Sequence, residues 1–140
     1  MIELDRKYLQ AMMEAGYVYL GMRRFKEARE VFEGLSVLAP ESEVPLVAIA
    51  NVDFCENKVQ QAIKRYRQAL KIDPDSIFAK VYLGEALFFA GKKDEGTDLL
   101  KEVAKTDKGG AGDFATALLD AIKAGFEPPA PKGGKGGKKQ

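Results

Sequence analysis

Small and apolar residues recur along this chain at a fixed interval. The recurring positions, in three sets, are Gly16, Ala28, Phe32 and Pro40; Ala50, Ala62, Tyr66 and Pro74; and Gly84, Gly96, Leu100 and Lys108. Small residues at a fixed interval allow helices to approach closely, and the bulky residues beside them fill the remaining space. The interval is about 34 residues, and self-similarity with a period of about 20–50 residues indicates a repeat protein.

Each interval contains two predicted helices separated by a short polar break. The expected pairs span residues 3–21 and 25–38, 43–55 and 59–72, and 77–90 and 93–106. Ser42 and Ser76 each follow a proline-containing turn and are expected to cap the helices that come next. No stretch alternates apolar and polar residues with a period of two over a useful length, so no sheet is expected. The pattern predicts an all-α protein.

A seventh helix is expected over residues 113–125. Asp113 is expected to cap its start, Lys123 lies near its negative end, and Gly125 is suited to the left-handed conformation that ends a helix. One apolar stripe runs along it, formed by Phe114, Ala117, Leu118, Ala121 and Ile122. A repeat array needs such a capping helix, because its last repeat otherwise exposes an apolar face.

The repeating residues resemble those of the tetratricopeptide repeat (TPR) family. The matching positions are Gly16, Tyr19, Ala28, Phe32, Pro40, Ala50, Ala62, Tyr66, Ala69, Pro74, Leu83, Gly84 and Gly91. The resemblance implies three helix-turn-helix repeats at about residues 9–42, 43–76 and 77–110, wound as a right-handed superhelical solenoid with the capping helix after them. The third repeat departs from the family pattern at Gly96, Val103 and Lys108, so its second helix is the weakest part of the match.

Charge divides the chain into a body and a tail. Residues 126–140, FEPPAPKGGKGGKKQ, carry four lysines and one glutamate, whereas the other 125 residues carry 18 basic and 20 acidic side chains. Proline, glycine and lysine without aliphatic residues bury too little surface to offset the entropy of ordering, so the tail is expected to be disordered. It is expected to serve either as a solubilising end or as a loose contact for an acidic partner or nucleic acid. The folded TPR domain is expected to span residues 1–125.

Composition excludes several classes of function. The body lacks the strong positive charge of a nucleic-acid-binding surface. No apolar run approaches the roughly 18 residues that would cross a bilayer, and the N-terminal sequence lacks a signal-peptide pattern, so we expect a cytoplasmic protein. The chain has no histidine and one cysteine, Cys55, which is expected to be buried. Without a Cys–His pair, a metal-ligand cluster or a phosphate-binding loop, we expect neither catalysis nor a cofactor.

The stretch FAKVYLGEALFF, residues 78–89, is apolar on more than one side of a helix. In TPR proteins the first helix of each repeat lines a concave groove, and the resemblance therefore implies that this second apolar face lines such a groove. An alternative is that some of these aromatics, Phe88 or Phe89 above all, are buried against the seventh helix or the neighbouring helix pair. The implied groove residues are Met13, Tyr17, Leu20, Val47, Asn51, Phe54, Phe78, Val81, Tyr82, Glu85, Phe88 and Phe89.

A groove with this lining suits an apolar peptide or an amphipathic helix. Some TPR co-chaperones instead hold a C-terminal carboxylate with lysine, arginine and asparagine side chains. The aligned positions here are Met13, Tyr17, Ala48, Phe78 and Tyr82. None of them would compensate the lost hydration of a carboxylate, so that function is excluded.

Short TPR proteins with an apolar groove resemble the chaperones of bacterial type III secretion systems, which hold a secreted subunit until export. Two subtypes fit. A needle-subunit chaperone, usually with a small co-chaperone, is favoured because the chain begins almost directly at its first repeat. A translocator chaperone is the alternative, supported by FKEAREVFEGLSVLAP and LLDAIKAG. A general TPR scaffold that assembles complexes, with homo-oligomers through the same aromatics, is the third hypothesis.

Overall fold

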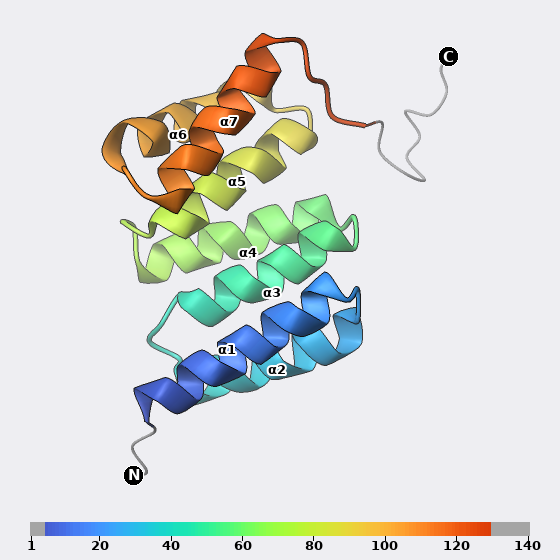
Figure 1. Ribbon diagram of the computed structural model, residues 1–140, viewed down its shortest axis with the longest axis vertical. Coiled ribbons are helices and arrows are strands. Elements are labelled where there is room, and N and C mark those ends of the chain that lie inside the picture. The colour runs from blue at the N-terminus through green and yellow to red at the C-terminus, as the bar shows by residue number, and fades with distance from the viewer. Residues whose placement is uncertain (1–4, 130–140) are drawn as a thin grey trace.

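The computed structural model describes residues 5–129 of the 140, and these form seven α-helices and no strand. The helices are α1 (Arg6–Gly21), α2 (Phe25–Leu38), α3 (Val44–Cys55), α4 (Val59–Ile72), α5 (Ile77–Phe89), α6 (Lys93–Thr106) and α7 (Gly110–Lys123). Consecutive helices pack as hairpins that stack along the long axis of the molecule, with α1, α3, α5 and α7 one above the other (Figure 1). The prediction of an all-α solenoid of helical hairpins with a capping helix is confirmed.

The helix boundaries follow local capping chemistry. Ser76 caps α5 as expected, because its hydroxyl accepts the backbone N–H of Ala79. Ser42 stands one residue earlier than expected, since Glu43 holds the N-cap position of α3 and the Ser42 hydroxyl accepts the N–H of Val44. Gly125 has a φ of 106°, which confirms its role as the left-handed residue after α7.

The expected start of the capping helix is wrong by three residues. The α7 helix begins at Gly110, and Asp113 lies inside its first turn. The carboxylate of Asp107 satisfies this end of the helix, because it accepts the N–H groups of Gly109 at 3.2 Å and Gly112 at 2.8 Å. A carboxylate ahead of the helix therefore provides the capping expected of Asp113. The predicted tail lies, from residue 130 onward, outside the described part of the chain.

The turn inside each hairpin contains one residue with a positive φ. These residues are Arg23, Asn57 and Gly91, with φ angles of 61°, 65° and 89°. They are equally spaced along the chain, at the interval of the repeat, and they follow the ends of α1, α3 and α5 in the same way. Asparagine and glycine adopt this conformation easily, whereas arginine does so at a steric cost. The repeat is therefore present in the backbone as well as in the side chains.

The small recurring residues lie where two helices touch. A Cβ atom added to Gly16 would lie 2.3 Å from the ring of Phe32, so α1 and α2 approach closely only because residue 16 has no side chain. In the third repeat Gly84 of α5 and Gly96 of α6 face each other. Gly96, a departure from the family pattern, therefore permits an unusually close contact between α5 and α6, and α6 is a complete helix of 14 residues.

We expect Gly96→Ala to destabilise the protein by about 1–3 kcal/mol, the usual cost of overpacking. The new Cβ would lie 2.7 Å from the carbonyl oxygen of Gly84 and 2.9 Å from the amide nitrogen of Phe88, and backbone atoms do not move aside easily. The control is Gly34→Ala in α2, where nothing lies within 4 Å of the added Cβ. That variant should gain about 0.5–1 kcal/mol of stability. Urea denaturation measures both, and equal effects would contradict the close contact.

A buried carboxylate joins the first two repeats. Asp53 on α3 is 1% exposed and lies 2.9 Å from Arg29 of α2 and 2.9 Å from Arg65 of α4. Arg29 also pairs with Glu56 at 2.6 Å. Aspartate is ordinarily a surface residue, so the repeat pattern gives no sign that Asp53 is buried. Its charge is compensated by two arginines from the neighbouring helices, as a buried charge requires.

Candidate functional site

An open pocket of about 280 Å³ lies between the first helices of the three repeats. The α1 helix contributes Met13 and Tyr17, α3 contributes Val44 and Val47, and α5 contributes Phe78 and Tyr82. Glu43 and Ser76, from the turns before α3 and α5, complete the wall. Five of the expected groove residues therefore line one pocket: Met13, Tyr17, Val47, Phe78 and Tyr82.

Aromatic rings form a continuous row from this pocket towards α7. The rings of Phe78 and Tyr82 stack with centroids 6.2 Å apart, and Tyr82 also lies 6.1 Å from Phe114 of α7. Phe78 is 55% exposed and Phe114 is 37% exposed, so both present apolar surface to solvent. The sequence pattern assigns Phe114 to the capping stripe and does not identify it as part of the groove. Its position at the start of the capping helix is the signal that could have suggested it.

Further along α5 a second group of aromatic rings surrounds Phe89. Its ring meets Phe54 of α3 edge to face at 5.3 Å, and both side chains are half-buried. Phe126 folds back from the end of α7 and lies 5.8 Å from Phe88 and 6.2 Å from Phe89. The ring of Phe126, which the sequence pattern assigns to the tail, thus covers this end of α5. The surface left open for a ligand is centred on Phe78, Tyr82 and Phe114.

Three polar residues hold equivalent positions on α1, α3 and α5: Tyr17, which lines the pocket, Asn51 and Glu85 (the floor residues). The amide of Asn51 donates to the hydroxyl of Tyr17 at 3.0 Å, and the hydroxyl of Tyr66 donates to the amide oxygen of Asn51. Burial raises the pKa of the Tyr17 and Tyr66 phenols, so both stay neutral and remain hydrogen-bonding groups at any physiological pH.

Glu85 differs from the other two floor residues because it has no hydrogen bond or ion pair within residues 5–129. Burial raises the pKa of its carboxyl to about 7. The carboxyl is therefore close to half-protonated at neutral pH, and it offers either a donor or an acceptor to whatever enters the groove.

Three of the expected groove residues lie elsewhere. Val81 and Phe88 are 1% and 3% exposed, because they pack between α5 and the pair α6 and α7. They are two helical turns apart and so share one side of α5. Leu20 packs against the core formed by α2 and α3. Cys55 was expected to be buried, and that prediction is wrong, because its side chain is exposed.

The pocket wall is apolar. No group of three His, Cys, Asp or Glu in the described residues is placed to hold a metal ion. None of the seven helices is long and apolar enough to span a membrane. Met13, Tyr17, Phe78 and Tyr82, which occupy the positions of a carboxylate clamp, form an apolar wall instead. An apolar segment gains most from such a surface, about 25 cal/mol for each Å² that it buries.

Comparison with known proteins shows which fold this architecture resembles. Residues 56–118 match the family model described as tetratricopeptide repeat, and no curated protein matches the chain by sequence. The fold is a TPR solenoid.

Three solved TPR structures show the range of proteins with this fold. The type III secretion translocator chaperone SycD of Yersinia enterocolitica superposes with a TM-score of 0.72 at 17% identity, over 88% of this chain and 97% of that one. PcrH in complex with the chaperone-binding region of PopD has a TM-score of 0.68 at 16% identity, over 89% and 98%. The first TPR of Spaghetti (RPAP3) bound to the HSP90 peptide SRMEEVD has a TM-score of 0.67 at 18% identity, over 88% and 99%. At these identities the similarity establishes the fold alone.

Proposed function

We propose that this protein is a non-catalytic chaperone that holds an apolar or amphipathic segment of a secreted client in the groove between α1, α3 and α5. The observation that carries the proposal is the open pocket lined by Met13, Tyr17, Val47, Phe78 and Tyr82, with the aromatic row beside it. An exposed apolar surface of this kind is costly in water and usually marks a binding site. The client is held in the cytoplasm before its export.

Among secreted clients, we favour a translocator over a needle subunit. The sequence pattern alone favours the needle type, but the comparisons support the alternative better. SycD is described as a translocator chaperone, and PcrH is described in complex with the chaperone-binding region of PopD. A peptide with a free C-terminal carboxylate, such as SRMEEVD, is a poor candidate, because the clamp positions here carry no cation.

Co-expression tests this proposal. The chain is produced together with a translocator, and separately with the needle subunit, of one secretion system from its own source organism. We expect the translocator to move from the insoluble to the soluble fraction and to co-purify with the chain, while the needle subunit gains little. Solubilisation of the needle subunit alone would support the needle interpretation. If neither client became soluble and the chain instead formed a stable oligomer, the scaffold hypothesis would replace the chaperone.

A further inference from the structure

The capping helix α7 occupies the place of the first helix of a fourth repeat. It begins at Gly110, while α5 begins at Ile77 and α3 at Val44, so the starts of these three helices are equally spaced along the chain. It also packs against α6 and α5 in the way that α5 packs against α4 and α3. The trough between α6 and α7 therefore corresponds to the trough between α4 and α5, where the next helix of the solenoid packs.

The α6 helix lies beside that earlier trough: it packs against α5 and reaches α4 through side chains, and these contacts show what such a helix needs. Val59, Ile63 and Leu70 of α4 pack against the core that includes α5 and Leu99 of α6. At the edge Arg67 of α4 reaches Glu95 of α6 at 3.1 Å. The α6 helix thus presents an apolar residue, Leu99, and an acidic residue one turn before it, Glu95, to the edge of this trough.

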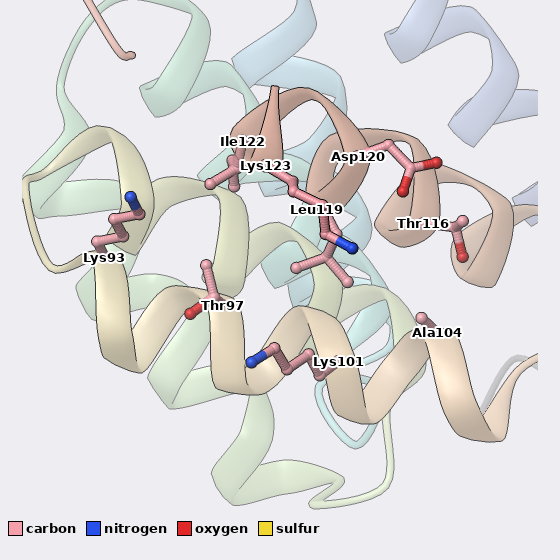
Figure 2. A pocket seen from close by; sticks show the side chains of 9 residues that line it. All are labelled: Lys93, Thr97, Lys101, Ala104, Thr116, Leu119, Asp120, Ile122 and Lys123. Carbon is pink, nitrogen blue, oxygen red and sulfur yellow. The ribbon is translucent and has the colours of Figure 1, made fainter. Parts of the chain in front are cut away.

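The face of α4 that meets α6 has its equivalent on α6, and this equivalent face carries more positive charge. Lys93, Thr97, Lys101 and Ala104 hold the positions in the third repeat that Val59, Ile63, Arg67 and Leu70 hold in the second. Together with α7 they enclose a trough of about 600 Å³. The side chain of Leu119 points from α7 towards α6, with Lys101 and Lys123 near it and Lys93 farther along α6 (Figure 2). The α7 residues in the lining are Thr116, Leu119, Asp120, Ile122 and Lys123.

The charges in this trough lack partners of opposite sign. Lys93, Lys101 and Lys123 line it and form no ion pair within residues 5–129, whereas Arg67, the equivalent of Lys101, is paired. Asp120 is the one acidic residue in the lining. Residues 130–140 do not supply the missing acids, because they contain four lysines and no acid.

We propose that the trough between α6 and α7 docks an amphipathic helix of a partner protein whose narrow apolar stripe is flanked by acidic residues. The stripe would pack on Leu119, Ala104 and Ile122, and the acids would meet the lysines as Glu95 meets Arg67. This surface involves helices α6 and α7 and is separate from the groove pocket, so a client and this partner bind at the same time.

Two designed 14-residue helical peptides test the proposal by fluorescence anisotropy. Both carry an alanine and leucine stripe; one is flanked by glutamates and the other by lysines. We expect the glutamate peptide to bind at least tenfold more tightly than the lysine peptide at 50 mM NaCl, with the difference shrinking at 300 mM as salt screens the charges. Similar binding of the two peptides would overturn the proposal.

Two variants locate the binding site. Lys101→Glu combined with Lys123→Glu should weaken the binding of the glutamate peptide at least tenfold. The matched control, Lys26→Glu with Lys71→Glu, makes the same charge change on α2 and α4, outside the trough, and should leave affinity unchanged. Equal loss in both variants, or loss on Tyr82→Glu, would show general charge attraction or binding in the groove and would overturn the proposal. Analytical ultracentrifugation shows whether the chain alone forms dimers. Dimers that are lost when Lys101 and Lys123 are both changed to glutamate would assign the trough to a second copy of this chain instead.

Discussion

Replacing Tyr82 by glutamate should weaken binding of the client segment by at least about a hundredfold, a loss typical of a central aromatic residue in an interface. The ring of Tyr82 lies between Phe78 and Phe114, at the middle of the aromatic row. A carboxylate there would lose hydration when the client covers it, and no cation lines the pocket to compensate. It would also stand one helical turn from Glu85, where a second negative charge repels it.

The change should leave the fold intact, because Tyr82 is only partly buried and glutamate is a good helix former. Circular dichroism checks this, and isothermal titration with the co-purified client measures the affinity. The control is Val37→Glu, which adds the same charge to a position of α2 that is 77% exposed. Retained affinity in Tyr82→Glu, or an equal loss in Val37→Glu, would rule out the groove as the client site.

Glu85→Gln should raise the free energy of unfolding at pH 8 by about 3 kcal/mol, and the gain should vanish near pH 4.5. Burial raises the pKa of this carboxyl from 4.5 in the unfolded chain to about 7 in the folded protein. Each pKa unit corresponds to about 1.4 kcal/mol. As the pH rises above 4.5 the unfolded chain ionises first, so the wild-type protein loses stability until about pH 7 and then no further. Glutamine removes this loss, because it does not ionise.

Urea denaturation between pH 4.5 and 8 measures the difference. Glu30→Gln, at an exposed position of α2, serves as the control and should follow the wild-type profile throughout. A variant of Glu85 whose stability difference from wild type stays constant with pH would show that the carboxyl is not held in an apolar environment. In that case the carboxyl of Glu85 would be more hydrated than the structure indicates.

The repeat made most of the fold predictable. Positions such as Gly16, Phe32 and Tyr66 recur at a fixed interval because each hairpin meets its neighbour in the same geometry. The predicted helix boundaries agree with the structure to within three residues. Errors arose where the repeat ends. Gly96 departs from the family pattern yet belongs to a close contact between helices, and Asp107 rather than Asp113 caps the last helix.

The groove was predictable in part. A single helix shows which residues share a side, but it does not show how many neighbours cover that side. Phe78 and Tyr82 remain on the open face, whereas Val81 and Phe88 are covered by α6 and α7. Phe114 joins the aromatic row from the segment assigned to a cap, and Phe126 packs against Phe88 from the segment assigned to a tail. The ionisation of Glu85 also depends on the surrounding helices, because its cause is burial.

By itself, the sequence determined the class of the protein, the number of hairpins and the existence of an apolar inner surface. Periodicity encodes these features, because every repeat must pack on the next through the same small and bulky side chains. The tertiary structure alone decided which aromatic rings stay open to a partner and which carboxylate is buried with arginines. It also decided that the trough beside the capping helix keeps its lysines unpaired within the described part of the chain. Burial and charge pairing arise from segments distant in the chain, and no local pattern records them.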